Sequence, residues 1–238
     1  MINTKEAFKP FLWLCIFAAA MGFLEAAVVI YMRRIFYPAG FGFPLQMFDP
    51  SLLFIEWLRE VATIIMLVSA AVIAGKNFLQ KFSFFLYSFA VWDISYYAFL
   101  KLALNWPASF FTWDLLFLIP ISWVGPVLAP IINSLTMILM AVCFVYVQKY
   151  NKSAKLELRE LALIIFGGII ILYTYLIDYS LLIAKNGFLP DFFSLATNQN
   201  FIALVSGYIP ETYNWELFII GEALILYATW RFYRRNDF

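Results

Sequence analysis

Charged side chains occur inside apolar segments of this 238-residue chain. In the segment Leu52–Ala74, Arg59 and Glu60 follow Glu56 by three and four residues, so the three side chains share one face of a helix. A charged side chain near the centre of a membrane helix costs about 2.5–3.5 kcal/mol. We therefore expect this face to contact protein or water. Carboxylates beside an arginine can form ion pairs, transfer protons or hold a cation.

Other apolar segments carry further acidic groups at matching positions. Tyr96 and Tyr97 follow Asp93 by three and four residues, which predicts a second polar helix face. At a rise of 1.5 Å per residue, the acids of five segments lie about 6–12 Å from one end of the predicted bundle. These acids are Glu25, Glu56, Glu60, Asp93, Asp178 and Glu222. A shared depth favours one polar layer near that end.

The candidate binding residues come from this layer and from the irregular stretch before the fourth apolar segment. They are Glu25, Glu56, Arg59, Glu60, Asp93, Tyr96, Tyr97 and Asp114. One hypothesis is a functional cavity that faces outward, roofed by the loop Ile35–Pro50 and the stretch Trp106–Pro126. The other is a structural network of ion pairs and hydrogen bonds that fixes the register of the helices, with the tyrosines as donors.

The composition predicts the surroundings of these groups. Hydrophobic residues make up 64% of the chain and charged residues only 13%, about half the ~25% usual in soluble domains. Several apolar runs reach the ~20 residues needed to cross a bilayer. We therefore predict an all-α integral membrane protein, a single polytopic domain over residues 1–238 with the lipid bilayer as its partner. The net charge of +1 gives no electrostatic reason to expect nucleic acid.

Six apolar segments are long enough to form a transmembrane bundle. A proline-rich stretch before the fourth span, with Pro120, Pro126 and Pro130, must interrupt any helix there. We predict that Trp113–Ile119 forms an interfacial or re-entrant half-helix capped by Thr112. A seventh span over this stretch is the alternative. The six predicted spans are Phe11–Tyr31, Leu52–Ala74, Phe82–Leu100, Val127–Val147, Leu161–Ala184 and Trp215–Tyr227.

Basic residues predict the orientation of these spans. In the six-span arrangement, eleven of the sixteen lysines and arginines fall on the side of the two termini, and four fall on the other side. The side richer in Lys and Arg is normally cytoplasmic. We therefore expect a multi-pass protein of the cytoplasmic (inner) membrane with both termini in the cytoplasm. A seven-span arrangement gives a weaker bias of ten to five.

Several kinds of chemistry are excluded by residues that the sequence lacks. The chain has no histidine, which removes histidine-bound zinc, histidine-ligated haem and histidine general bases. It has no Gly-rich phosphate loop, no Cys-x-x-Cys pair and no paired-aspartate motif of prenyltransferases. Cys15 and Cys143 are expected to be buried thiols. We expect neither a metal nor a cofactor.

Small residues recur every four positions at Ala18, Gly22 and Ala26, which lets another helix approach closely. That helix belongs either to a partner membrane subunit or to this chain's own bundle. Six spans with both ends inside, an outward pocket under long loops and this stripe together resemble the substrate-binding subunits of energy-coupling-factor vitamin transporters. The resemblance is one of architecture and implies that a small solute is bound from outside.

Three functions are compatible with these features. The first is binding or translocation of a small solute or cation through an outward-facing polar cavity within the membrane. The second is a non-catalytic subunit of a larger membrane complex. The third is an intramembrane enzyme that acts on a lipid of the outer leaflet, for which the sequence assigns no catalytic residue.

Overall fold

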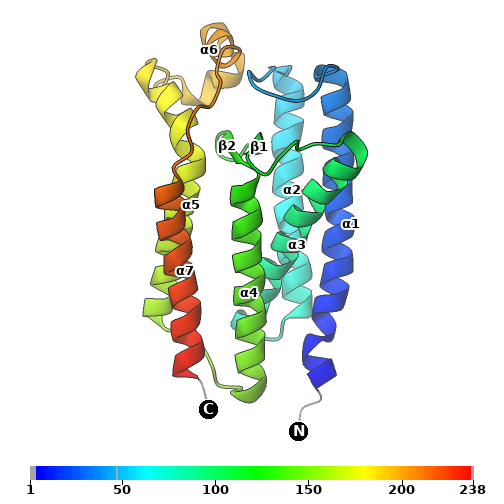
Figure 1. Ribbon diagram of the computed structural model, residues 1–238, viewed down its shortest axis with the longest axis vertical. Coiled ribbons are helices and arrows are strands. Elements are labelled where there is room, and N and C mark those ends of the chain that lie inside the picture. Colours follow the sequence, from blue (N-terminus) through cyan, green and yellow to red (C-terminus); the bar gives the residue numbers. More distant parts are fainter. Residues whose placement is uncertain (1–3, 47, 237–238) are drawn as a thin grey trace.

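The protein is an elongated bundle of long helices, and both termini lie at the same end (Figure 1). The structure, a computed structural model, describes residues 4–46 and 48–236. The long helices that run along the bundle are α1 (Thr4–Phe36), α2 (Pro50–Ala74), α3 (Phe78–Leu104), α4 (Leu128–Tyr150), α5 (Leu158–Lys185) and α7 (Trp215–Arg235). The short helices η1 (Phe192–Thr197) and α6 (Gln199–Val205) lie at the end opposite the termini.

Four of the described helices, α1, α2, α4 and α5, are long and apolar enough to cross a membrane. Their outer surfaces carry large apolar side chains, such as Trp13 and Ile73, that are 63% and 87% exposed. Contiguous exposed apolar surface of this kind indicates contact with lipid. A mostly helical, multi-pass membrane protein is therefore supported. The other two long helices, α3 and α7, are not among them: serines and tyrosines make α3 less apolar, and α7 carries five charged residues.

The helix α2 begins and ends close to the positions that the sequence indicates. Asp49 is its N-cap, and its carboxylate accepts a hydrogen bond from the Ser51 backbone N–H at 2.9 Å. Pro50 stands in the first turn, where its missing N–H is not needed. Gly75 follows the last helical residue. The hydrogen bonds from Ser51 also hold the pKa of Asp49 below its ordinary value, which keeps the cap ionised.

The predicted half-helix at Trp113–Ile119 is wrong. This stretch forms a β-hairpin, in which β1 (Trp113–Phe117) pairs antiparallel with β2 (Trp123–Pro126). Thr112 caps no helix there, and its hydroxyl instead accepts a hydrogen bond from the Ser109 backbone N–H at 3.0 Å. Bulky aromatic and aliphatic residues suit a strand, and the prolines fall in the connection and at the end of β2. Pairing between the strands satisfies backbone groups that would otherwise be costly to bury.

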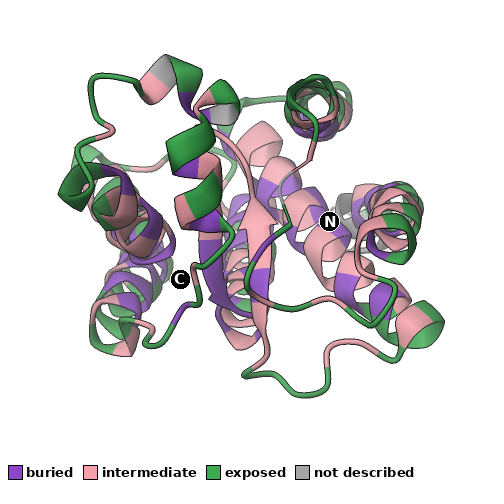
Figure 2. Ribbon diagram, turned by 90° about the horizontal axis from the view of Figure 1, so that it is seen from above, coloured by how far each residue is buried: buried purple, intermediate pink, exposed green. Residues whose placement is uncertain are grey.

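The hairpin lies inside the bundle, near the end opposite the termini (Figure 1, Figure 2). Its tight fit against α5 is visible at Gly125, which pairs with Asp114 across the hairpin. A Cβ atom on Gly125 would lie 3.2 Å from the ring of Tyr175. The hairpin therefore occupies the space that a continuous transmembrane helix would fill in a simpler bundle.

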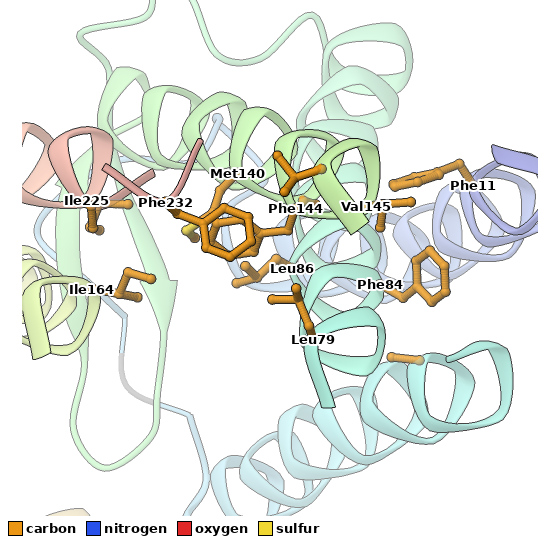
Figure 3. Packing of buried hydrophobic residues seen from close by; sticks show 14 of the residues in the cluster. Phe11, Leu79, Phe84, Leu86, Met140, Phe144, Val145, Ile164, Ile225 and Phe232 are labelled. Atoms are coloured by element: carbon orange, nitrogen blue, oxygen red, sulfur yellow. The ribbon is translucent and has the colours of Figure 1, made fainter. Parts of the chain in front are cut away.

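Two groups of helices make up the bundle around the hairpin. The helix α3 packs against α1, α2 and α4, while α7 packs against α5 and α4. Buried rings join the elements at the terminal end, as Figure 3 shows for Phe144 and Phe232. The centroids of these two rings are 4.7 Å apart. One apolar core thus lies between the termini and the hairpin, and a second apolar cluster packs η1 and α6 against the hairpin and α5 at the opposite end.

The small-residue stripe of α1 is occupied by α3 of the same chain. Ala18 and Ala26 are fully buried. A Cβ atom on Gly22 would lie 2.7 Å from the backbone oxygen of Trp92. The stripe therefore brings α1 and α3 into close contact.

Candidate functional site

A polar cavity of about 90 Å³ lies between α1, α2, α3 and the hairpin. All eight side chains that the sequence singles out line it: Glu25, Glu56, Arg59, Glu60, Asp93, Tyr96, Tyr97 and Asp114. Arg33, which was not among them, lines it as well. A volume of this size accommodates a few water molecules or a small polar group. The structure thus brings the candidate residues to one place.

Arg59 holds two of the acids. Its Nε donates to Glu56 Oε2 at 2.7 Å within α2, and its Nη1 donates to Glu25 on α1. The second oxygen of Glu25 accepts from the Thr63 hydroxyl at 3.4 Å. The side chains of Arg59, Glu25 and Glu56 are only 21%, 11% and 7% exposed. This group therefore ties α1 to α2 through charge-assisted hydrogen bonds.

Glu60 binds the backbone of the hairpin and does not pair with Arg59. Both of its carboxylate oxygens accept from the backbone N–H of Leu118, at 3.1 and 2.9 Å. Leu118 directly follows β1, so this carboxylate fixes the position of the hairpin against α2. No cation pairs with Glu60 among the ion pairs of the described residues. Its carboxyl group lines the cavity without an ion-pair partner in that part of the chain.

Asp93 is the second acid of the cavity that has no ion-pair partner in the described part of the chain. Its Oδ2 accepts from the hydroxyl of Ser134 on α4 at 2.8 Å. The neighbouring Tyr96 also lines the cavity, and its ring packs edge-on against the ring of Tyr97. Among the described residues, Glu60 and Asp93 are thus the two carboxyl groups of the cavity that form no ion pair.

Arg33 and Asp114 form a buried ion pair. The Nη2 of Arg33 donates to Asp114 Oδ1 at 2.9 Å, and the other oxygen of Asp114 accepts from the Tyr97 hydroxyl at 3.2 Å. Burial raises the pKa of Asp114, and the Arg33 guanidinium opposes that shift. The guanidinium lies 4.0 Å from the ring centroid of Phe41 and 3.8 Å from that of Trp106. It is therefore held between two aromatic faces.

Sequence reasoning missed Arg33 because it adjoins Arg34 at the end of an apolar segment. A basic pair at that position is typical of a membrane boundary. The two residues differ in the structure, since Arg33 is buried and Arg34 is exposed. The spacing offered a signal, because Arg33 follows Glu25 by eight residues. That separation puts both side chains on a similar face of α1, two turns apart.

Two acids predicted at the same depth lie elsewhere. Asp178 on α5 lines a separate hollow beside Lys185 and Tyr208. Glu222 on α7 lines another hollow beside Phe218 and α4. Depth along the bundle was therefore a sufficient guide for Glu25, Glu56, Glu60 and Asp93, but not for acids on α5 and α7.

Two buried donors at the cavity have no acceptor among the described residues. They are Nη1 of Arg33 and the indole Nε1 of Trp92. Both side chains are about nine-tenths buried or more, with residue exposures of 6%. An unmet donor costs about 1–3 kcal/mol when it is buried. An acceptor oxygen in the cavity, from water or a ligand, would remove this cost.

The acids are not arranged as a metal site. Within residues 4–46 and 48–236, no three acidic or cysteine side chains come close enough together to hold a metal ion. Calcium needs six to eight oxygen ligands, whereas an ammonium group needs only a few hydrogen-bond acceptors.

No family model, no curated protein and no solved structure matches the chain.

Proposed function

We propose that this membrane protein binds a small solute with a positively charged amine in the polar cavity. The observation that carries the proposal is the excess of carboxylates over guanidinium groups. Arg59 pairs with Glu25 and Glu56, and Arg33 pairs with Asp114. Glu60 and Asp93 have only neutral donors. They are the two carboxylates that would contact the amine.

The electrostatic gain from such a ligand is large. A unit cation about 4 Å from a carboxylate is stabilised by ~4 kcal/mol at an effective dielectric constant of ~20. Without a cation, a buried carboxylate that has no partner is costly and tends to take up a proton instead. The ligand's ammonium group therefore supplies the positive charge that the protein does not place beside these two carboxylates. Oxygen atoms of the ligand can accept hydrogen bonds from Arg33 and Trp92.

We also propose that α3 and α7 cross the membrane with the four apolar helices, which makes six spans with cytoplasmic termini. All six helices run along the bundle, and the termini share one end (Figure 1). The polar faces of α3 are turned inward against α1 and α4, which lowers the cost of its charges in lipid. In this orientation the cavity opens near the outer surface of the cytoplasmic membrane.

Cysteine labelling tests this orientation. In a variant with Cys15 and Cys143 replaced by serine, Asn200→Cys on α6 should react with a membrane-impermeant thiol reagent in intact cells. The matched variant Lys152→Cys, between α4 and α5, should react only after lysis. Both positions are exposed, so accessibility within the protein does not decide the result. The opposite pattern of labelling would reverse the proposed orientation.

Binding of ethylammonium to the purified protein, measured by isothermal titration calorimetry, tests the proposed ligand. Hydrogen bonds to charged groups contribute about 1.5–3 kcal/mol, so Glu60→Gln and Asp93→Asn should each weaken binding roughly tenfold to a hundredfold. The amides keep the shape of the carboxylates, and thermal unfolding should show that both variants fold.

Asp178→Asn is the matched control, because it removes an acid of α5 that lies outside the cavity. It should bind ethylammonium as the unmodified protein does. If the unmodified protein binds no ethylammonium, or if Glu60→Gln and Asp93→Asn both bind it unchanged, the cavity is not an amine site.

A further inference from the structure

A second, apolar cavity of about 350 Å³ adjoins the polar one. Its lining comes from α2, α3, α4, α5 and the hairpin, and includes Ile64, Phe89, Met137 and Leu172. Its size lies within the ~300–1,000 Å³ range of ligand-binding pockets. We call it the apolar groove.

The apolar groove lies between α2 and α5, which each pack mainly on other elements. The helix α2 packs mainly on α3, whereas α5 packs mainly on α7 and β2. Figure 1 and Figure 2 place the hairpin between these two groups. Gly168 of α5 lines the groove, and a Cβ atom there would meet nothing within 4 Å. Gly168 is itself exposed, so the groove is open at this position to the surface of the bundle.

The two cavities share part of their lining. Trp92, Asp93 and Leu116 belong to both. Asp93 places a carboxylate at this junction, and Trp92 places a buried indole N–H there that lacks an acceptor among the described residues. A single molecule can thus extend from the polar cavity into the groove, with polar atoms at the junction.

We infer that the ligand is an amphiphile, a membrane lipid whose amine-bearing head lies in the polar cavity and whose hydrocarbon chain lies in the apolar groove. The inference rests on the proposed function for the head and adds the chain. An ester, amide or hydroxyl oxygen between head and chain would accept the hydrogen bond of Trp92. The lipid enters sideways between α2 and α5, so its chain never passes through water.

The chain itself contributes little to specificity, because lipid tails are as apolar as the groove. Recognition comes from Glu60 and Asp93, while the groove admits only molecules whose chain fits it. Filling the groove should therefore exclude the lipid and leave the binding of a chain-free amine intact. This separates the inference from the proposed function.

Photolabelling provides the test. The probe is a long-chain primary amine with a diazirine midway along the chain, added to the protein in phosphatidylcholine nanodiscs. After irradiation, mass spectrometry should find the label on peptides that contain Met137 and Leu172. Excess ethylammonium should lower this labelling, and a probe with a hydroxyl in place of the amine should label these peptides weakly.

Gly168→Phe places a ring at the groove and should lower labelling of these peptides roughly tenfold or more, because the ring competes with the chain for the same space. The matched variant Ile169→Phe adds a ring at the next position of α5, where the native side chain is 56% exposed. It should label as the unmodified protein does. Unchanged binding of ethylammonium by Gly168→Phe shows that this variant is folded.

Two results would overturn the inference. If Gly168→Phe labels like the unmodified protein while ethylammonium binding still depends on Glu60 and Asp93, the groove holds no chain, and the amine site stands alone. If Gly168→Phe blocks labelling but the hydroxyl probe labels equally and ethylammonium does not compete, the groove binds chains without an amine head. That second result overturns the inference, and the proposed function is then decided by the calorimetric binding of ethylammonium alone.

Discussion

Replacing Arg33 by methionine is expected to lower the free energy of unfolding by about 3–5 kcal/mol, the usual cost of removing one partner of a buried ion pair. Asp114, the partner, is fully buried in β1, and the side chain of Arg33 is 7% exposed. Without the guanidinium, a carboxylate is left among apolar groups with only the Tyr97 hydroxyl and the Leu115 backbone N–H as donors.

The loss should exceed that of an isolated ion pair, because Arg33 also joins three segments of the chain. Its guanidinium lies between the rings of Phe41, in the loop before α2, and Trp106, in the turn after α3. A desolvated cation–π contact contributes about 2 kcal/mol. Methionine keeps most of the apolar stem but offers neither charge nor fork-shaped donors. The roof of the cavity should therefore loosen.

Thermal unfolding of the purified protein measures this effect, and Arg34→Met is the matched control. Arg34 is adjacent and exposed, so the same change there should shift stability by less than about 0.5 kcal/mol. The double variant Arg33→Met with Asp114→Asn should recover part of the loss, since no unpaired charge remains. Equal destabilisation by the two arginine variants would contradict the buried pair.

The polar face of α2 shows how much of the candidate site a sequence can predict. Glu56, Arg59 and Glu60 must lie on one side of any helix, and the cost of charge in lipid turns that side inward. Distance from the helix ends then sets a depth, which placed Glu25 and Asp93 beside them. These two arguments are local to each helix, and they brought together the acids and the arginine of α1, α2 and α3 at the polar cavity but not Arg33.

The hairpin shows where local arguments fail. A short apolar run such as Trp113–Ile119 fits a buried helix or a buried strand equally well. What decides between them is pairing with Trp123–Pro126, which lies several residues further along the chain. The sequence also could not predict the direction in which α5 and α7 turn Asp178 and Glu222, because that direction depends on which helices pack together. The depth of a side chain along the bundle follows from the sequence of its own helix. The direction in which that helix turns the side chain depends on the neighbouring helices.

Arg59→Met should destabilise the protein by about 3–5 kcal/mol as well, because it leaves two carboxylates without their cation. The sequence allowed Arg59 to pair with Glu56 or Glu60. In the structure it pairs with Glu56 on its own helix and with Glu25 on α1, whereas Glu60 accepts from the hairpin backbone. The pairing can be distinguished by asking which glutamate, once neutralised, restores stability.

Arg59→Met combined with Glu25→Gln and Glu56→Gln should regain most of the lost stability in thermal unfolding, since the buried charges disappear together. Arg59→Met combined with Glu60→Gln should regain much less, because Glu60 is fixed by the Leu118 backbone N–H and its amide replacement would weaken that contact. Groups in one network show interaction energies of about 0.5–3 kcal/mol, which such cycles resolve. A recovery that follows Glu60 instead would mean that Arg59 points toward the hairpin and that α1 and α2 are held together without it.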